Sequence, residues 1–379
     1  MTSRERVECA LNHKQPDMMP LSIGSTSNDQ YTRMALRRYA EKYDIGEYDE
    51  VVTWKTVQTV ITPPQIQEQF NADFRMIRPG DRDNPFDDRF NPEDGTVYDA
   101  FGVKLKPILY YYDVVERPLS GPITMDEIKN FPWPDPYDPG IRRGVREQAL
   151  KYYNEGYALV TDFLALGPFE GSLWIRGWED FLCDFYEEPR IAEALMDHVV
   201  EYWMGMLDQM LDECGDLLSV VCCNDDLGMQ DRCLIAPDMY EKYVKKYAKR
   251  VYDFVHSKTK AKLLHHSCGS CFDLLPHLID IGVEVLNPVQ VSAAKMDPVS
   301  LKKTYGKDLC FWGGVDTQTV LENYTPEQVD AEVKRLMEIF GEDGGYFVAP
   351  SHNIQATVAP ENVHAMWTAA NKYRTIFSK

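Results

Sequence analysis

The chain has 379 residues, of which 44% are hydrophobic, and 60 acidic against 40 basic side chains give it a net charge of −20. That charge opposes binding to nucleic acids and to anionic membranes, and the hydrophobic fraction suffices for a large core. No apolar run approaches the length of a membrane span and the N-terminus lacks the core of a signal peptide, so the nine cysteines predict reduced thiols in a cytoplasmic protein.

The first 140 residues predict few regular elements. A short helix is expected over 3–13, a first strand over 21–24 and a second helix over 29–43. Residues 97–112 read as a β-hairpin, and stretches rich in Asp, Asn, Pro and Gly flank it. We therefore expect residues 51–140 to form an insertion over one end of a single domain that spans 1–379.

From residue 141 the pattern becomes regular, with apolar strands separated by helices. Strands are expected over 158–164, 217–223, 262–268, 283–290, 309–316 and 346–355. Strands that alternate with helices form a parallel sheet, and together with one or two earlier strands they predict a (β/α)8 barrel of the TIM type. A doubly wound sheet is the alternative fold, but no glycine-rich nucleotide loop follows the first strand.

Polar side chains gather where the predicted strands end. In a (β/α)8 barrel the active site lies at this face, because all the strands point the same way. The residues concerned are Asp162, Asp225, Asp226, His266, Cys268, Asn287, Gln290, Asp316, His352, Asn353 and Gln355.

Residues 262–271 carry the most specific chemical signal. His266 and Cys268 share one face of their strand, and imidazole nitrogen and thiolate sulfur are donors that zinc prefers. The barrel would bring His352 to them as a third ligand, which leaves the open position of a catalytic zinc site. A packed His–Cys pair, a redox pair of Cys268 with Cys271, and His352 as a general acid or hydrogen-bond donor are the alternatives.

Acidic residues near this face are candidates for catalysis. Asp225 and Asp226 follow a buried strand, where one of them should point into the barrel mouth as a general base, an orienting group or a fourth ligand. Capping of a turn is the alternative for this pair. Glu170, in a glycine-containing stretch with aromatic neighbours, is either a substrate-pocket residue or an exposed loop residue. The other candidates for substrate binding are Asp162, Gln290, Asp316, Asn353 and Gln355.

Several short motifs resemble those of the uroporphyrinogen decarboxylase superfamily, and the resemblance is strongest over residues 158–370. It implies a (β/α)8 barrel. The motifs are 167–170 (Gly-Pro-Phe-Glu), 225–228 (Asp-Asp-Leu-Gly), 237–240 (Pro-Asp-Met-Tyr), 245–247 (Lys-Lys-Tyr), 266–269 (His-Ser-Cys-Gly), 287–290 (Asn-Pro-Val-Gln), 312–316 (Trp-Gly-Gly-Val-Asp) and 349–353 (Ala-Pro-Ser-His-Asn).

Two branches of that superfamily differ at residues that can be read here. True uroporphyrinogen decarboxylases carry an arginine-rich segment after the first strand, whereas this chain has no arginine between Pro20 and Arg33. The second branch, which includes methylcobamide:coenzyme M methyltransferases, has a His-x-Cys zinc motif and a distant Cys. His266 and Cys268 match that motif, and His352 stands in the place of the distant Cys.

The resemblance to the second branch implies zinc-dependent methyl transfer between a small methylated substrate and a corrinoid, of the cobalamin type, held by a partner protein. The methyl group would come from an ether, as in O-demethylation, or from an amine or thiol. It implies zinc ligation by His266, Cys268 and His352, with catalytic roles for Asp225, Asp226 and His352. The alternatives are a metal-free carboxy-lyase for another carboxylated substrate and a non-catalytic barrel that binds a corrinoid partner. A homodimer is left open.

Overall fold

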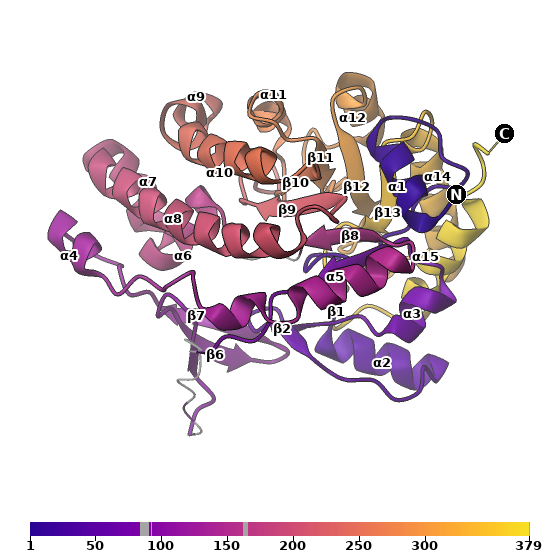
Figure 1. The fold of residues 1–379 in the computed structure, drawn as a ribbon, viewed down its shortest axis with the longest axis horizontal. Helices are drawn as coiled ribbons and strands as arrows, with labels where there is room; N and C mark the ends of the chain where they lie inside the picture. Colours follow the sequence, from indigo (N-terminus) through magenta and orange to yellow (C-terminus); the bar gives the residue numbers. More distant parts are fainter. Residues whose placement is uncertain (84–90, 92, 162–165, 379) are drawn as a thin grey trace.

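Seven parallel strands form one curved sheet in the computed structural model, which describes residues 1–83, 91, 93–161 and 166–378. Nearly every residue in these strands is buried, as expected for apolar runs that are covered on both faces. In their order across the sheet the strands are β13 (Tyr346–Pro350), β12 (Cys310–Val315), β11 (Val285–Asn287), β10 (Lys262–His266), β9 (Val220–Asn224), β8 (Ala158–Thr161) and β4 (Phe74–Ile77) (Figure 1).

The segment around Leu21 closes this sheet into a barrel. Leu21 forms a parallel bridge with Val348, and the Ser22 amide donates to the Val348 carbonyl at 3.0 Å. On the other side the Asp73 amide donates to the Leu21 carbonyl at 3.0 Å. Leu21 therefore lies between β13 and β4 and supplies the eighth strand position, which confirms the predicted (β/α)8 barrel. The strand expected over 21–24 is reduced to this bridge, because the chain turns at Gly24 (φ +61°).

Apolar side chains fill the barrel and a helix covers the end at which its strands begin. Helix α1 (Ser3–Leu11) contributes Val7 and Leu11 to the cluster that contains Trp312 and Phe347 from the barrel interior. The Gly345 amide, just before β13, donates to the Ala10 carbonyl at 3.0 Å. Because α1 closes the N-terminal ends of the strands, the opposite end carries the polar residues.

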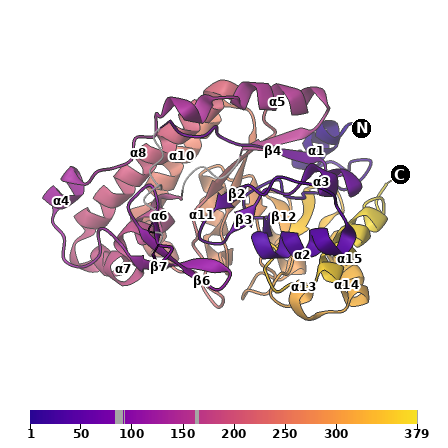
Figure 2. The ribbon, with the colours of Figure 1, turned by 90° about the horizontal axis from the view of Figure 1, so that it is seen from below.

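An outer layer of helices surrounds the strands, with α2 and α15 on one side and α7 and α8 on the other in Figure 2. The helices are α2 (Arg33–Tyr43), α3 (Pro64–Gln69), α4 (Met125–Asn130), α5 (Val145–Asn154), α6 (Pro168–Arg176), α7 (Trp178–Glu187), α8 (Pro189–Cys214), α9 (Pro237–Met239), α10 (Lys245–Lys258), α11 (Leu275–Asp280), α12 (Pro298–Tyr305), α13 (Val320–Asn323), α14 (Pro326–Phe340) and α15 (Pro360–Tyr373). Proline opens many of them, since the first turn needs no amide donor from that position.

Two small antiparallel sheets lie outside the barrel, on its lower side in Figure 1. Their strands are β1 (Tyr31–Thr32), β2 (Val52–Trp54) and β3 (Thr59–Val60) in one sheet, and β5 (Val97–Tyr98), β6 (Lys104–Ile108) and β7 (Tyr111–Glu116) in the other. The second sheet contains the predicted hairpin. The range 51–140, expected as an excursion from the barrel, also supplies α3 and the barrel strand β4, so the chain returns to the barrel within it.

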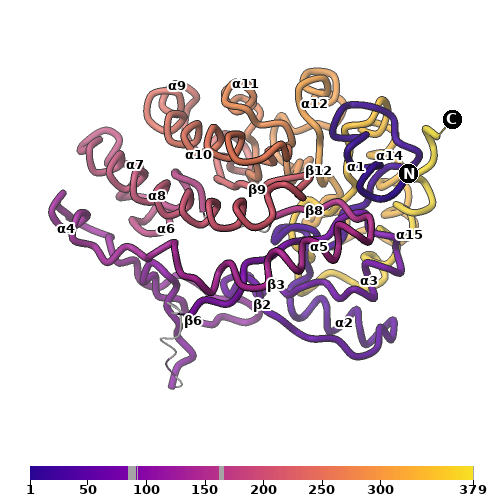
Figure 3. Tube along the Cα trace, in the orientation of Figure 1, coloured from indigo at the N-terminus to yellow at the C-terminus, as the bar shows by residue number. Residues whose placement is uncertain are grey.

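The predicted helices and strands agree with the observed ones apart from their ends and apart from the strand expected over 21–24, and residues 162–164 of the strand expected over 158–164 lie outside the described residues. The helix expected from Pro237 onward contains a π-helical turn over 240–244 between α9 and α10. Among the described residues, no helix is both long and apolar enough to span a bilayer. Both chain ends lie on the same side of the molecule (Figure 3), where Met1 and Ser378 each hydrogen-bond to Asp17.

Candidate metal centre at the barrel mouth

His266, Cys268 and His352 converge at the carboxyl ends of β10 and β13. One ligand atom from each lies within 4.8 Å of the other two, and the Cys268 Sγ is 3.5 Å from the His266 Nε2. The two imidazole rings are 5.9 Å apart at an angle of 62°. No other group of at least three potential metal ligands of these types occurs in the described part of the chain.

The donor set fits zinc. Zinc bonds of about 2.0–2.3 Å to nitrogen and sulfur in a tetrahedron place neighbouring donors roughly 3.3–3.7 Å apart. The observed 3.5 Å between His266 and Cys268 lies in that range, and the ligand atom of His352 lies within 4.8 Å of both. Two imidazoles and one thiol would leave a fourth position for a substrate atom.

Asn287 fixes the orientation of the His266 ring. Its Oδ1 lies 2.5 Å from the His266 Nδ1, and its Nδ2 donates to the Trp312 carbonyl at 3.2 Å. Because the amide must present its oxygen to the ring, Nδ1 carries the proton and the Nε2 lone pair faces Cys268. His266 and Asn287 are both buried, and they stand opposite each other in the register of β10 and β11.

Two backbone hydrogen bonds hold Cys268 and the residue after it in place. Its amide donates to the Asp226 Oδ1 at 2.7 Å, and the next amide, of Gly269, donates to the Gln290 Oε1 at 2.7 Å. Gly269 has φ +77°, and a Cβ there would lie 2.6 Å from the backbone of Gly228. A glycine is therefore required for the close approach of the two loops that frame the thiol.

Asp225, Asp226 and Glu170 form an acidic cluster beside the three ligands. Both oxygens of Asp225 accept backbone hydrogen bonds at the start of α6, from Glu170 at 2.7 Å and from Phe169 at 3.3 Å. Gly167 permits this contact, because a Cβ there would lie 2.5 Å from the Asp225 Cβ. Asp225 thus caps a neighbouring helix, while Asp226 faces the ligands with its Oδ1 3.9 Å from the His266 Nε2.

Glu170 occupies the first turn of α6 and points back to the same cluster. Its Oε2 accepts from the Asn224 Nδ2 at 2.7 Å and from the Asp226 amide at 3.3 Å. Burial and then the charges of Asp226 and Asp225 hold the pKa of Glu170 well above its usual range. Burial likewise raises the pKa of Asp226, and it raises that of Asp225 to about 8. Three buried acidic groups with raised pKa values therefore lie beside the candidate ligands.

The candidate ligands are held in different protonation states by their surroundings. Burial lowers the pKa of His266 to about 4, and burial followed by the nearby His266 lowers that of His352 to about 4. Both imidazoles are therefore neutral at pH 7 and have a free lone pair. Burial and the charges of Asp226 and Glu170 raise the pKa of the Cys268 thiol well above its usual range, so a metal ion must displace its proton.

The other described residues expected to bind substrate each have a polar atom bonded within the protein, although the Asp316 Oδ2 and the Asn353 Nδ2 are buried without a hydrogen-bond partner. Gln290 bonds to Gly269 and to the Gln230 Oε1 (3.0 Å), and Asp316 caps α13 through the Thr319 amide (2.5 Å). The Asn353 Oδ1 accepts from the Gln30 amide at 3.1 Å, and the Gln355 Oε1 accepts from the Tyr111 hydroxyl at 2.8 Å. Asp162 lies outside the described residues.

The sequence missed the part that Asn287 and Asn224 play in orienting His266 and Glu170. Each asparagine could have been found from its position, because both end a barrel strand and stand opposite His266 in the register of a neighbouring strand. It also missed a buried polar turn after Leu21, in which the Asp29 Oδ1 accepts from the Thr26 amide at 2.7 Å and the Ser22 hydroxyl bonds to the same carboxylate.

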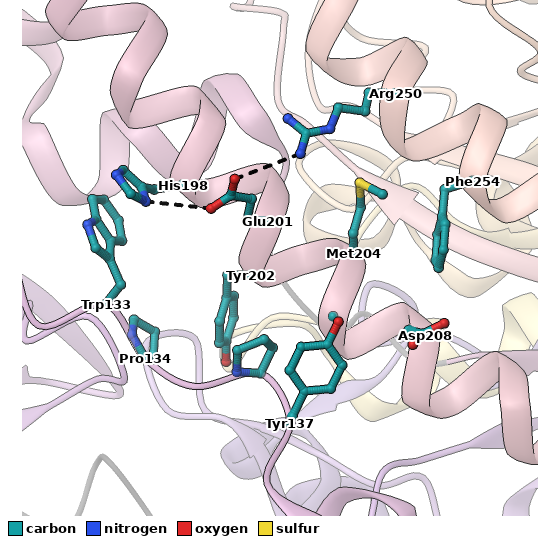
Figure 4. Close-up of a pocket in the computed structure, with 12 residues that line it drawn as sticks. Trp133, Pro134, Tyr137, His198, Glu201, Tyr202, Met204, Asp208, Arg250 and Phe254 are labelled. Atoms are coloured by element: carbon teal, nitrogen blue, oxygen red, sulfur yellow. Dashed lines mark ion pairs between the residues drawn. The ribbon is translucent and has the colours of Figure 1, made fainter. Parts of the chain in front are cut away.

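A separate groove of about 460 Å³ lies on the outer helical layer, away from the barrel mouth. Trp133 and Tyr137 form one side and residues of α8 and α10 form the other (Figure 4). There Glu201 lies 3.8 Å from His198 and 3.9 Å from Arg250, so the charges in the groove are paired. This groove shares no residue with the candidate metal centre.

Comparison with known proteins agrees with the motifs at the barrel mouth. The family model described as uroporphyrinogen decarboxylase (URO-D) matches residues 122–373, which is more than half of the chain. The chain belongs to this family. The resemblance inferred from the sequence motifs is thereby confirmed, and the matched range includes all three candidate ligands.

Relatives within the family carry two different names. The chain is 24% identical over 278 residues to methylcobamide:CoM methyltransferase MtbA of Methanosarcina mazei, covering 72% of this chain and 75% of that protein. It is 22% identical over 306 residues to uroporphyrinogen decarboxylase of Pseudoalteromonas atlantica, covering 75% and 78%. The structure of a methyltransferase from Methanosarcina mazei superimposes with a TM-score of 0.65 at 16% identity, covering 98% of this chain and 99% of the other, and shares its fold.

Proposed function

We propose that the protein is a zinc-dependent methyltransferase that moves a methyl group between a small methylated substrate and a corrinoid carried by a partner protein. The observation that carries the proposal is the convergence of His266, Cys268 and His352, with the His266 ring oriented by Asn287. The similarity to methylcobamide:CoM methyltransferases adds support from the sequence.

The zinc would be held by His266, Cys268 and His352. The two imidazoles are neutral donors, and the Cys268 thiol becomes an anionic donor once zinc displaces its proton. Bound zinc would act as a Lewis acid on the heteroatom that carries or receives the methyl group. Asp226 holds the Cys268 backbone and Glu170 accepts from the Asp226 amide, so both carboxyl groups are fixed beside the open position. Asp225 acts on the reaction only through the helix that it caps.

The transfer is balanced in both directions. In demethylation the methyl group leaves its heteroatom without the bonding electron pair, and cobalt(I) supplies the pair for the new cobalt–carbon bond. The heteroatom then gains a proton, for which Glu170 or Asp226 is placed, because each carboxyl has a raised pKa next to the ligands. In the reverse direction the same carboxylate takes the proton of the acceptor, and cobalt(I) is released.

The surroundings of the site argue against a porphyrinogen substrate. The turn after Leu21 contains the buried Asp29 where the decarboxylases place arginines, and the site itself carries Asp226 and Glu170. A substrate with many carboxylates would find no arginine in this turn to pair with, and burying its charges beside acidic groups is unfavourable at low dielectric. A metal-free lyase for another carboxylated compound is the alternative function.

The reaction can be followed directly with free cobalamin. Zinc-loaded protein is mixed with cob(I)alamin and a panel of methyl ethers, methylamines and methyl thioethers, and formation of methylcob(III)alamin is followed by absorbance. We expect formation with one class of donor, and its loss after chelation of zinc and recovery after zinc is restored. Release of carbon dioxide from a carboxylated substrate by metal-free protein, without methyl transfer, would contradict the proposal and favour the lyase.

A further inference from the structure

The β6–β7 hairpin ends in an exposed apolar tip. Ile108 and Tyr110 are 50% and 47% exposed, and Leu109 between them is 95% exposed. Three consecutive large apolar side chains in water are unfavourable for an isolated chain, and such patches mark contact surfaces. We refer to these three residues as the hairpin tip.

The backbone conformation at the hairpin tip is unfavourable for a leucine. Ile108 pairs with Tyr111, so Leu109 and Tyr110 form a two-residue turn, and Leu109 has φ +50°. Asparagine or glycine suits a turn position with positive φ, whereas a leucine side chain is strained there. Leu109 therefore costs stability both through its backbone and through its exposure, and the fold alone does not explain it.

Hydrogen bonds attach the hairpin to the loop that follows the metal centre. The Tyr111 hydroxyl donates to the Gln355 Oε1 at 2.8 Å and accepts from the Ala356 amide at 3.3 Å. The Gln355 Nε2 donates to the Asn353 carbonyl at 2.8 Å, next to the candidate ligand His352. In Figure 1, β6 and β7 lie with β2 on the lower side of the barrel. The tip therefore stands beside the barrel mouth.

We propose that the hairpin tip is a docking contact for the protein that carries the corrinoid, an inference that rests on the proposed function. A protein-bound corrinoid must bring its cobalt to the open position beside His352, so its carrier has to cover the rim of the mouth where the tip stands. A carrier that leaves after each turnover requires a small contact surface, and a few exposed apolar side chains provide one.

Substitution of Leu109 by asparagine tests the docking contact, because it removes the apolar side chain and suits the positive φ. The measured quantity is the rate of methyl transfer from an active methyl donor to corrinoid proteins that are purified from the same organism and reduced to cobalt(I), divided by the rate with free cob(I)alamin. Val115→Thr is the matched control, since Val115 is 53% exposed on β7 but lies away from the turn.

We expect Leu109→Asn to lower this ratio about tenfold and to melt no lower than the parent, whereas Val115→Thr leaves the ratio unchanged. An unchanged ratio in Leu109→Asn, or no corrinoid protein that reacts faster with the parent than free cobalamin does, would overturn the docking contact alone. A parent dimer that dissociates on Leu109→Asn would also overturn it, since the tip would then be a self-contact. A parent inactive with free cob(I)alamin and every methyl donor of the panel would remove the proposed function and the docking contact together.

Discussion

Replacing Asn287 by alanine tests whether the amide controls the metal affinity of His266. The change removes the 2.5 Å contact to Nδ1 and leaves a buried N–H without its acceptor, which costs about 1–3 kcal/mol. It also frees the imidazole to rotate its Nε2 lone pair away from Cys268. Loss of such a supporting partner lowers metal affinity by about 10–100-fold, which corresponds to roughly 1.4–2.7 kcal/mol.

The assay is a zinc titration against a competing chelator at pH 7. We expect the dissociation constant of Asn287→Ala to rise about 10–100-fold, whereas Asn287→Asp, whose carboxylate still accepts from Nδ1, stays close to the parent. Asn362→Ala is the control, because Asn362 is also buried and donates to the carbonyls of Leu321 (2.9 Å) and Tyr324 (2.7 Å), outside the metal centre. It should lower the melting temperature without weakening zinc. An Asn287→Ala protein with parental zinc affinity would refute the reasoning.

Three further predictions concern the same site. His352→Cys should retain zinc and His352→Ala should weaken it severely; equal affinity in all three proteins would make His352 a proton donor and pass the ligand role to an acidic residue. Uroporphyrinogen should not be decarboxylated; coproporphyrinogen formed at about 1 per second or faster would contradict the choice of branch. Zinc affinity should rise about tenfold per pH unit from pH 6 to 8, because the raised pKa of Cys268 keeps the thiol protonated until zinc displaces the proton. His266 and His352 have pKa values of about 4 and are already neutral in this range. A flat profile of zinc affinity against pH in isothermal titration would exclude Cys268 as a ligand.

Much of the barrel could be predicted because its strands are apolar runs separated by amphipathic helices. The place of the first strand was predicted but its length was not, because residues 21–24 look like a strand locally, whereas only Leu21 pairs with β13 before the chain turns. The strand β4, within the range 51–140, was not predicted, because Phe74–Ile77 is short and Arg75 interrupts its apolar pattern. Such short strands are defined by their neighbours in the barrel and leave only a weak local pattern.

The candidate metal centre was predicted as a set of residues, but its internal arrangement was not. Alternation along a strand places His266 and Cys268 on one face, and the barrel brings His352 to them from β13. The sequence gives no means of separating Asp225 from Asp226, since adjacent carboxylates have equal local context. The structure separates them, because the start of α6 takes both oxygens of Asp225 and leaves Asp226 beside the ligands.

The zinc content of the purified protein tests the central claim most directly. Elemental analysis of the parent and of Cys268→Ala, with circular dichroism to verify that both are folded, gives the number of zinc ions per chain. We predict about one zinc per chain in the parent, from a site with three protein ligands, and none in Cys268→Ala. A folded parent without zinc even after incubation with the metal, or full zinc occupancy in Cys268→Ala, would contradict the assignment of the metal centre.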